Sequence, residues 1–363
     1  MRKIINFVEN DNQFHIDTLQ GRSYNSLPNQ LVLYKERRKM AFKDFIRKSI
    51  SLMLAGLMTA SMCACSANTS GSGKLNIVTT IFPEYDWVRN IAGDNINNID
   101  LTLLCDNGVD MHSFQPTASD IVKISSCDVF VYVGGESDEW VEDVLKEAVN
   151  EKMQVVKLMD VIGESAVEEE IVEGMQAEED EDEGDGGTEY DEHVWLSLKN
   201  AQKCVLAISA AMGAVDPSNN KNYYMNSVSY NNTLDELDKK YAEAVNNAGR
   251  DTILFADRFP FRYLTDDYNL NYYAAFAGCS AETEASFDTV VFLAGKVDEL
   301  GLNAVITIDS GDQAIAKTII ENTSSKDQEI LVMDSMQSTK TSDNRSYVEI
   351  MENNLVVLEK ALG

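Results

Sequence analysis

The stretch Asp110-Met-His-Ser-Phe-Gln-Pro-Thr-Ala-Ser-Asp120 holds one of only three histidines in a chain of 363 residues. A second stretch, Asp191-Glu-His-Val-Trp-Leu-Ser197, holds another, and in both stretches the imidazole stands beside carboxylates in a loop-like segment. Either histidine alone would more often be a hydrogen-bonded structural residue. Their occurrence in matching contexts favours metal ligands instead. We therefore predict that the fold brings His112 and His193 together around one divalent cation.

Composition narrows the class of protein. The length suggests about two domains, and 44% apolar with 25% charged residues is typical of a globular protein with a real core. The formal charge of -30 argues against nucleic acid as a partner, because phosphates bind basic surfaces, and it favours a protein that attracts cations. Much of the negative charge falls in an acidic loop at residues 164–192, which we expect to be solvated.

Three short segments precede the predicted fold. Residues 1–39 have no clear hydrophobic period, and we expect a disordered or non-native extension, with translation starting at Met40. Residues 40–65 have the basic start and short apolar run of an export signal, and their end resembles a bacterial lipobox. We expect lipidation at Cys65, with an ordinary cleaved signal as the alternative. Residues 66–74 are rich in Ser, Gly and Asn and predict a flexible tether.

From residue 75 onward, short apolar strands alternate with amphipathic helices. This alternation predicts a parallel sheet with helices on both faces for an N-terminal lobe, residues 75–215. Ligands of such sheets collect beyond the carboxyl ends of the strands, where His112 is predicted to lie. The strands are expected at residues 75–80, 99–104, 129–133 and 155–158, and the helices at 85–91, 117–126, 140–149 and 198–212.

The second half repeats the pattern after a long helix. Residues 216–248 carry one apolar stripe at helical spacing, which predicts a rigid linking helix. Residues 249–363 form a second α/β lobe. The predicted fold is therefore α/β, with two Rossmann-like lobes containing parallel sheets, one linking helix and a metal cleft between the lobes. Strands are expected at 252–255, 272–275, 304–308 and 330–333, and helices at 261–266, 287–300, 314–321 and 347–362.

These features resemble the solute-binding lipoproteins of bacterial zinc and manganese ABC transporters. The resemblance covers about residues 74–363 and is carried by Ile77-Val-Thr-Thr-Ile-Phe-Pro83, the two histidine stretches and the long helix. It implies a metal held between the lobes by four side chains, one pair from each lobe. His112 and His193 would then be the pair from the first lobe.

The second pair is less well defined. Where many members of the family have a third histidine, this chain has Asp257, and the fourth ligand would be Asp309 or Asp312. The alternatives are that Asp257 pairs with the neighbouring Arg258 and that the other two aspartates cap a helix. Cys279 lies in a nearby loop of the second lobe, but we exclude it as a ligand because a thiolate would bind zinc too tightly for release.

The expected ligand set constrains the metal. Two neutral imidazoles and two carboxylates form a site of intermediate hardness, which excludes Cu(I) and disfavours Ca²⁺. The carboxylates resemble the manganese branch of the family, whereas the long charged loop resembles the zinc branch. We therefore expect Zn²⁺ ahead of Mn²⁺ as the transported ligand.

The leading hypothesis is a lipid-anchored, extracytoplasmic receptor. It would capture the metal outside the bacterial cell and deliver it, as a monomer, to the permease of an ABC transporter. A metallohydrolase is the first alternative, but the chain has no HExxH helix and no spare histidine for proton transfer, so we expect no enzyme. A lipoprotein adhesin with a structural metal is the second alternative.

Overall fold

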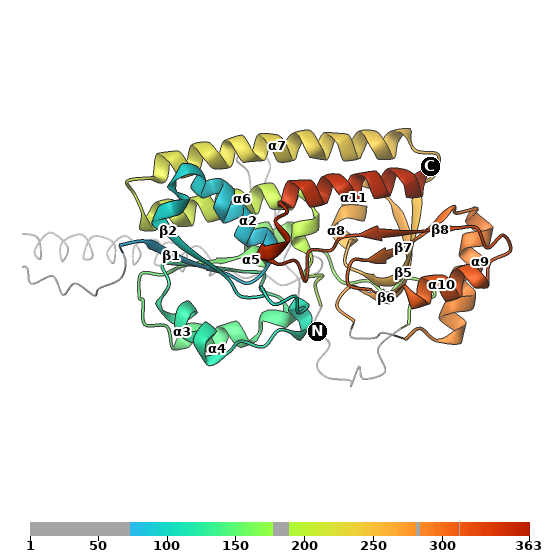
Figure 1. Ribbon diagram of the computed structural model, residues 1–363, viewed down its shortest axis with the longest axis horizontal. Helices are drawn as coiled ribbons and strands as arrows, with labels where there is room; N and C mark the ends of the chain where they lie inside the picture. Colours follow the sequence, from blue (N-terminus) through green and yellow to red (C-terminus); the bar gives the residue numbers. More distant parts are fainter. Residues whose placement is uncertain (1–72, 177–188, 281–283, 312) are drawn as a thin grey trace, which may run out of the picture. The chain divides into compact units, whose positions relative to one another are not determined.

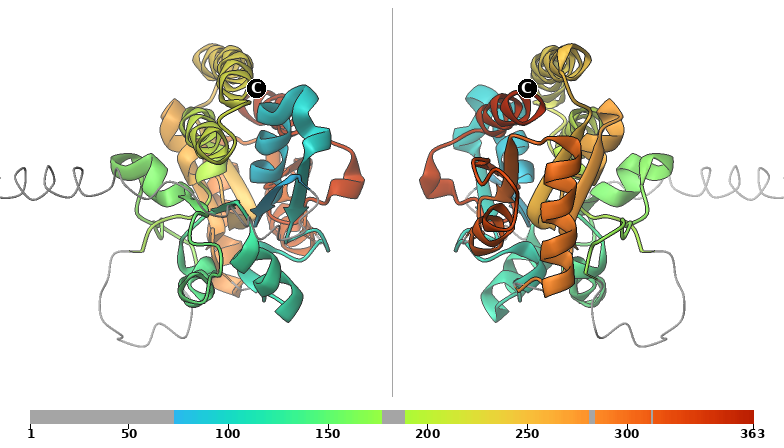
Figure 2. Two further views of the ribbon diagram at one scale, coloured as in Figure 1. Left: turned by 90° about the vertical axis from the view of Figure 1, so that its left-hand side faces the viewer. Right: turned by 90° about the vertical axis from the view of Figure 1, so that its right-hand side faces the viewer.

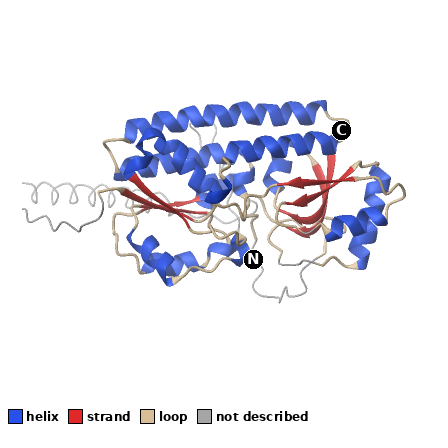
Figure 3. Ribbon diagram, in the orientation of Figure 1, coloured by secondary structure: helices blue, strands red, loops and turns tan. Residues whose placement is uncertain are grey.

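The computed structural model describes residues 73–176, 189–280, 284–311 and 313–363. The predicted leader, Cys65 and Asp312 lie outside these residues. Residues 70–363 form one compact unit with two four-stranded parallel sheets (Figures 1 and 3). In the part of the chain that is described, no helix combines the length and hydropathy needed to cross a membrane.

The first sheet has the strand order β2-β1-β3-β4 and is covered on both faces. Apolar side chains of α2 and α6 pack on one face, whereas α3 and α4 cover the other, which buries Phe130 between them and the sheet. The elements of this lobe are β1 (Leu75–Thr79), α2 (Phe82–Ala92), β2 (Ile99–Leu103), α3 (Ala118–Ser126), β3 (Val129–Tyr132), α4 (Trp140–Lys146), β4 (Gln154–Lys157), α5 (Leu158–Ile162) and α6 (Leu198–Val215).

The second sheet repeats this plan with the order β6-β5-β7-β8. Helices α9 and α10 cover one face, and α11 packs on the opposite face (Figure 1). The elements are β5 (Thr252–Phe259), α8 (Arg262–Tyr268), β6 (Asn271–Ala277), α9 (Phe287–Leu300), β7 (Ala304–Ile308), α10 (Ala314–Glu321), β8 (Glu329–Met333) and α11 (Tyr347–Leu362). The predicted fold class is confirmed.

Helix α7 (Asn220–Asn247) runs along both lobes as a single element of 28 residues (Figures 1 and 2). Its buried side chains Leu234, Leu237 and Tyr241 join one apolar cluster that also contains Ile77 of the first sheet and Ile306 of the second. The same cluster includes side chains of α2, α6 and α11. The two lobes therefore share a continuous core, which holds them in a fixed relation.

Local signals set several element ends where the sequence predicts them. The Ser286 hydroxyl accepts a hydrogen bond from the Thr289 N–H at the start of α9, and Gly301 ends this helix with a positive φ of 61°. An N-cap hydroxyl and a left-handed glycine are the usual start and stop of a helix. The structure accordingly gives residues 287–300 the predicted bounds, as it does for strand 304–308.

The described part of the acidic loop has a tethered backbone, although most of its acidic side chains face solvent. The Glu169 N–H donates to the Glu189 carbonyl, and the Gln176 N–H donates to the Ala275 carbonyl at the edge of the second sheet. Glu164, Glu168 and Glu173 are exposed, whereas Glu192 is only 2% exposed. Burial at Glu192 is the departure from a solvated loop that a count of charges does not reveal, and solvation of the loop as a whole stays a prediction because residues 177–188 lie outside the described residues.

Candidate metal site

His112 stands on a single helical turn, Met111–Ser113, between β2 and α3. The Asp110 side chain caps this turn by accepting a hydrogen bond from the His112 N–H at 3.1 Å. Helix α3 then begins behind it with the predicted capping box, in which Thr117 and Asp120 exchange hydrogen bonds. The local sequence thus fixes the position of the ring.

His193 is held in the same manner but lies deeper. Its backbone N–H donates to Asp191 Oδ1 at 2.8 Å, and the turn Val194–Leu196 starts directly after it. The imidazole is fully buried and stacks at a tilt against Trp195, with ring centroids 5.3 Å apart. In both predicted motifs, an aspartate two residues before the histidine anchors its backbone.

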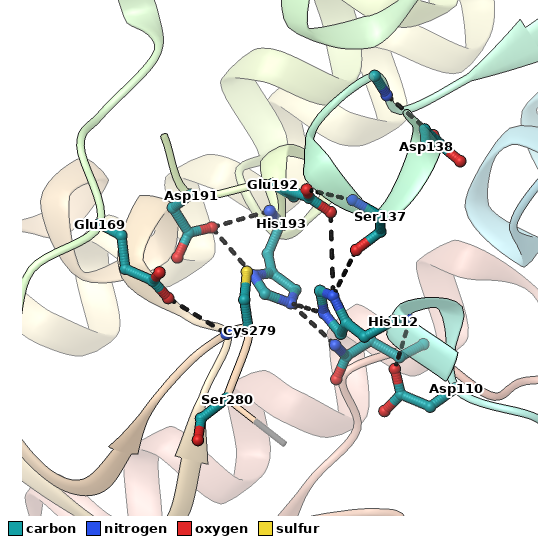
Figure 4. Close-up of polar contacts among 12 residues, drawn as sticks. Asp110, His112, Ser137, Asp138, Glu169, Asp191, Glu192, His193, Cys279 and Ser280 are labelled. Carbon is teal, nitrogen blue, oxygen red and sulfur yellow. Dashed lines mark hydrogen bonds and ion pairs between the residues drawn. The ribbon is translucent and has the colours of Figure 1, made fainter. Parts of the chain in front are cut away.

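The structure brings the two rings together (Figure 4). Nε2 of His112 lies 3.1 Å from Nε2 of His193, although the residues are 81 positions apart in sequence. Two imidazoles on a tetrahedral zinc with Zn–N bonds near 2.05 Å have their nitrogens about 3.3 Å apart. The observed separation matches the spacing of two ligands on one metal ion.

The outer nitrogens of both rings have oxygen partners. Nδ1 of His193 lies 3.0 Å from Asp191 Oδ1, and Nδ1 of His112 lies 2.7 Å from Ser137 Oγ. With Nδ1 protonated and donating to these oxygens, each Nε2 keeps its lone pair. Hydrogen bonding at the outer nitrogen is how proteins orient histidines that bind metals.

The electrostatic surroundings differ between the two rings. Burial and the neighbouring charge of His193 lower the pKa of His112 to about 3, so this ring is neutral at pH 7. Burial alone would lower the pKa of His193, but the charge and hydrogen bond of Asp191, together with the charge of Glu192, raise it above its usual value. Carboxylates that favour a proton on His193 also favour a metal cation there.

Two buried oxygen atoms beside the rings have no hydrogen-bond partner. Oε2 of Glu192 lies 3.9 Å from Nδ1 of His112, while its Oε1 accepts from the Ser137 N–H. Gln337 is 2% exposed, and its Nε2 lies 2.8 Å from Nε2 of His193 while its Oε1 has no partner. Orphaned buried oxygens are costly, so these two atoms are acceptors beside the histidine pair that no described protein group satisfies.

Cys279, which the sequence led us to exclude as a ligand, lies beside the histidine pair. Among the described residues, His112, His193 and Cys279 form the group of three or more His, Cys, Asp or Glu side chains that could hold a metal, with ligand atoms within 4.8 Å of one another. Cys279 follows β6 in the second lobe, and its side chain points to the histidine pair (Figure 4). Its place in a loop directly after a predicted strand is the sequence signal that points to it.

The expected aspartates of the second lobe lie elsewhere. Strand β5 continues beyond residue 255, and a bulge between Phe255 and Arg258 re-aims the side chains there. Asp257 accepts hydrogen bonds from the backbone N–H groups of Arg258 and Ile308. The expected pairing of Asp257 with the Arg258 side chain is wrong, because that guanidinium bonds Asp110 of the first lobe at 2.8 Å.

Asp309 also accepts hydrogen bonds outside the histidine pair. Its Oδ1 receives the backbone N–H and the hydroxyl of Ser335, and the residue at the N-cap of α10 is Gln313. The structure therefore brings neither Asp257 nor Asp309 into the group formed by the histidines and Cys279. Their role as ligands stays a prediction, as does that of Asp312.

Two α/β lobes with parallel sheets and a shared core, together with two imidazoles that face each other, are the architecture of a two-lobed solute-binding protein. The family model described as ZnuA, "Zinc-uptake complex component A periplasmic", matches residues 77–361. The chain therefore belongs to this family of solute-binding proteins of ABC transporters.

Curated relatives agree with the family model. The chain is 31% identical over 315 residues to the zinc-binding lipoprotein AdcA of Streptococcus pneumoniae strain R6. This alignment covers 86% of the present chain and 61% of AdcA. It is 28% identical over 322 residues to the high-affinity zinc uptake system protein ZnuA of Bacillus subtilis, covering 85% of this chain and 97% of that protein. The chain thus spans about three-fifths of AdcA.

Solved structures show the same fold. The Zn(II)-bound ZnuA-like domain of Streptococcus pneumoniae AdcA aligns with a TM-score of 0.62 at 27% identity, covering 80% of this chain and 99% of that domain. The metal-dependent lipoprotein YcdH of Bacillus subtilis aligns with a TM-score of 0.63 at 26% identity, with the same coverages. Both likenesses extend across the two lobes described above.

Proposed function

We propose that this chain is an extracytoplasmic substrate-binding lipoprotein that captures a divalent transition metal, zinc ahead of manganese, and delivers it to the permease of an ABC transporter. The observation that carries the proposal is the 3.1 Å approach of the two Nε2 atoms, whose rings are oriented through Nδ1 by Asp191 and Ser137. Family membership and the zinc-binding names of AdcA and ZnuA support the choice of metal.

Binding, and not catalysis, is the function that this site supports. A catalytic zinc needs an open coordination position and a neighbouring general base. The carboxylates nearest the rings lie at their outer nitrogens: Asp191 holds Nδ1 of His193, and Glu192 accepts the Ser137 N–H through Oε1 while its Oε2 lies 3.9 Å from Nδ1 of His112. We therefore expect no hydrolase activity, in keeping with a family of solute-binding proteins.

The remaining parts of the proposal concern location and partners. We propose that the segment 40–65 directs export and that the lipid on Cys65 anchors the mature chain, as a monomer, to the outer surface of the cell membrane. The net charge of -30 would raise the local concentration of cations near the site at low ionic strength. Mass spectrometry of the membrane-extracted chain tests the anchor directly.

Competition calorimetry tests the metal-binding core of this proposal. Zinc and manganese are titrated separately and together into the purified, metal-free chain. We expect one tight site per chain, with zinc displacing manganese, and no unfolding on chelation because the shared core does not depend on the metal. A chain that binds neither ion contradicts the proposal, and a chain that unfolds on chelation indicates a structural metal, as in the adhesin alternative.

A further inference from the structure

We propose that the Cys279 thiolate is the third ligand of the metal ion held by His112 and His193, and that it gives the site a preference for zinc over manganese. This inference rests on the proposed function, because it concerns the same ion. It departs from the four-ligand set of histidines and carboxylates that the sequence resemblance implies.

The first support is the placement of the three ligand atoms. The sulphur of Cys279 and one ring nitrogen of each histidine lie within 4.8 Å of one another. The Nε2 atoms of the two rings are 3.1 Å apart. Zn–S bonds near 2.3 Å and Zn–N bonds near 2.05 Å at tetrahedral angles require N–S separations of about 3.5 Å. Small movements of a loop side chain span the difference.

The second support is the way in which the backbone around Cys279 is built onto the site. A Cβ on Gly278 would lie 3.0 Å from Cε1 of His193 and 2.9 Å from the Phe259 carbonyl, so this position has no room for a side chain. The Cys279 N–H donates to Glu169 Oε1 at 3.2 Å. Glycine on one side and the carboxylate on the other therefore hold the thiol against the histidine pair.

The third support is the orphaned oxygen of Gln337. Its amide faces Nε2 of His193 at 2.8 Å, is nearly fully buried, and leaves Oε1 without a partner. Rotation of this amide by half a turn exchanges the positions of its nitrogen and its oxygen. The neutral oxygen would then face a cation between the rings as a candidate ligand. After that rotation Gln337 would supply an oxygen for the fourth position, while Asp257 and Asp309 are not members of the group formed by the histidines and Cys279.

A thiolate changes which metal the site selects. Soft sulphur ligands favour zinc, whereas manganese prefers carboxylates and water. When the metal binds, the S–H bond of Cys279 breaks heterolytically, the proton leaves to solvent and the electron pair forms the sulphur–metal bond. Two imidazoles, one thiolate and one amide oxygen make a set suited to tetrahedral zinc.

Release of the ion does not exclude this ligand set. The Arg258 guanidinium bonds Asp110 at 2.8 Å and the Ser280 carbonyl at 3.4 Å, so a fixed positive charge stands between the loops of His112 and Cys279. Because Arg258 is paired with the Asp110 carboxylate, it repels a divalent cation only in part and offsets a small share of the affinity gained from sulphur.

Cobalt(II) spectroscopy on the purified, untagged full chain tests the ligand. Bound cobalt gives visible d–d bands whatever its ligands, whereas a sulphur ligand adds a near-ultraviolet charge-transfer band. We expect both features in the wild type and in Cys105→Ser, whose thiol is buried in the first lobe away from the group. In Cys279→Ser we expect the d–d bands without the charge-transfer band.

The outcomes separate this inference from the proposed function. Wild-type d–d bands without charge transfer, or a charge-transfer band that survives in Cys279→Ser, overturn the role of Cys279 and leave the metal receptor intact. A wild type that binds neither cobalt nor zinc overturns both. Zinc affinity provides a second measurement: we expect Cys279→Ser to lose at least the roughly 100-fold that outer partners can contribute, with a smaller loss for manganese. Equal losses for the two metals overturn the claim about selectivity.

Discussion

The first lobe presents two imidazoles whose backbones are held by aspartates two residues earlier in sequence, whereas the second lobe presents a thiol on a loop and turns its aspartates toward backbone donors. His193 is anchored by Asp191 through both its N–H and its ring. Cys279 instead depends on Glu169 and on the absence of a side chain at Gly278. One half of the site is built locally, and the other is built by tertiary contacts.

This difference teaches that short motifs are informative only when their supporting residues lie in the same stretch. In the first lobe, an Asp-X-His pattern carries both the ligand and its anchor. In the second lobe, the bulge in β5 sets the direction of the Asp257 side chain, and the residues next to it in sequence do not predict this bulge. The experiments below separate the two halves.

The largest loss of zinc affinity is expected when a histidine of the first lobe is replaced. His112→Ala and His193→Ala should each weaken zinc binding by at least about 100-fold, because each removes a ligand and not merely an outer partner. Calorimetry with zinc measures the loss. Since His193 is fully buried, His193→Gln, which fills most of the space, serves as a second variant, and thermal unfolding monitors the fold. Wild-type zinc affinity in both alanine variants would contradict the proposed metal site.

Asp191, which anchors His193, should contribute less to zinc affinity than the ligand His193 itself. Asp191→Asn keeps an oxygen near Nδ1 but removes the negative charge, so we expect zinc binding to weaken by about 10- to 100-fold. Competition against a chromophoric chelator measures the dissociation constant. Asp267→Asn is the matched control, because the Asp267 carboxylate likewise accepts from a side chain, the Ser197 hydroxyl, and pairs with Lys199 at 3.2 Å, but lies outside the metal group. Equal affinity in the two variants contradicts the role of Asp191.

The second-lobe aspartates should affect stability more than binding. Asp257→Asn and Asp309→Asn each weaken hydrogen bonds to backbone donors, so we expect a loss of about 1 kcal/mol in the free energy of unfolding. Zinc affinity should change by less than the roughly 10-fold effect of an outer partner. Urea unfolding and calorimetry on the same samples give both quantities. A loss of 100-fold in affinity would restore either aspartate as a ligand.

Glu84 should leave metal binding unchanged and alter only the pH dependence of stability. Burial and the charge of Asp138 raise the pKa of Glu84 to about 8, so the folded chain retains a proton that the unfolded chain loses near pH 4.5. The contribution of Glu84 to the free energy of unfolding is therefore fully present below pH 4.5 and is lost as the pH rises to about 8. Glu84→Gln should flatten that slope in urea unfolding between these pH values. An unchanged slope would show that Glu84 does not titrate in this range.

Much of the fold was predictable because its signals are local. Residues 287–300 lie between a capping serine and a left-handed glycine, and alternating apolar strands and helices specify parallel sheets. The convergence of His112 and His193 followed from their matching contexts. By contrast, the docking of Gln176 on the second sheet and the turn of Arg258 toward Asp110 depend on partners about 100 to 150 residues away. No local pattern encodes such contacts.

The apolar cluster that runs from Ile77 to Ile306 also limits how cargo can leave. Separation of the two lobes would expose this cluster to water, with a free-energy cost of about 25 cal/mol for each Å² of apolar surface uncovered. Met111 belongs to this cluster, so moving the turn that carries His112 would also uncover part of it, whereas Cys279 is not among its members. If the chain hands over a metal ion as proposed, the movement that exposes least apolar surface is therefore that of the Cys279 loop, and a receiving permease would need to displace only this loop while the shared core stays closed.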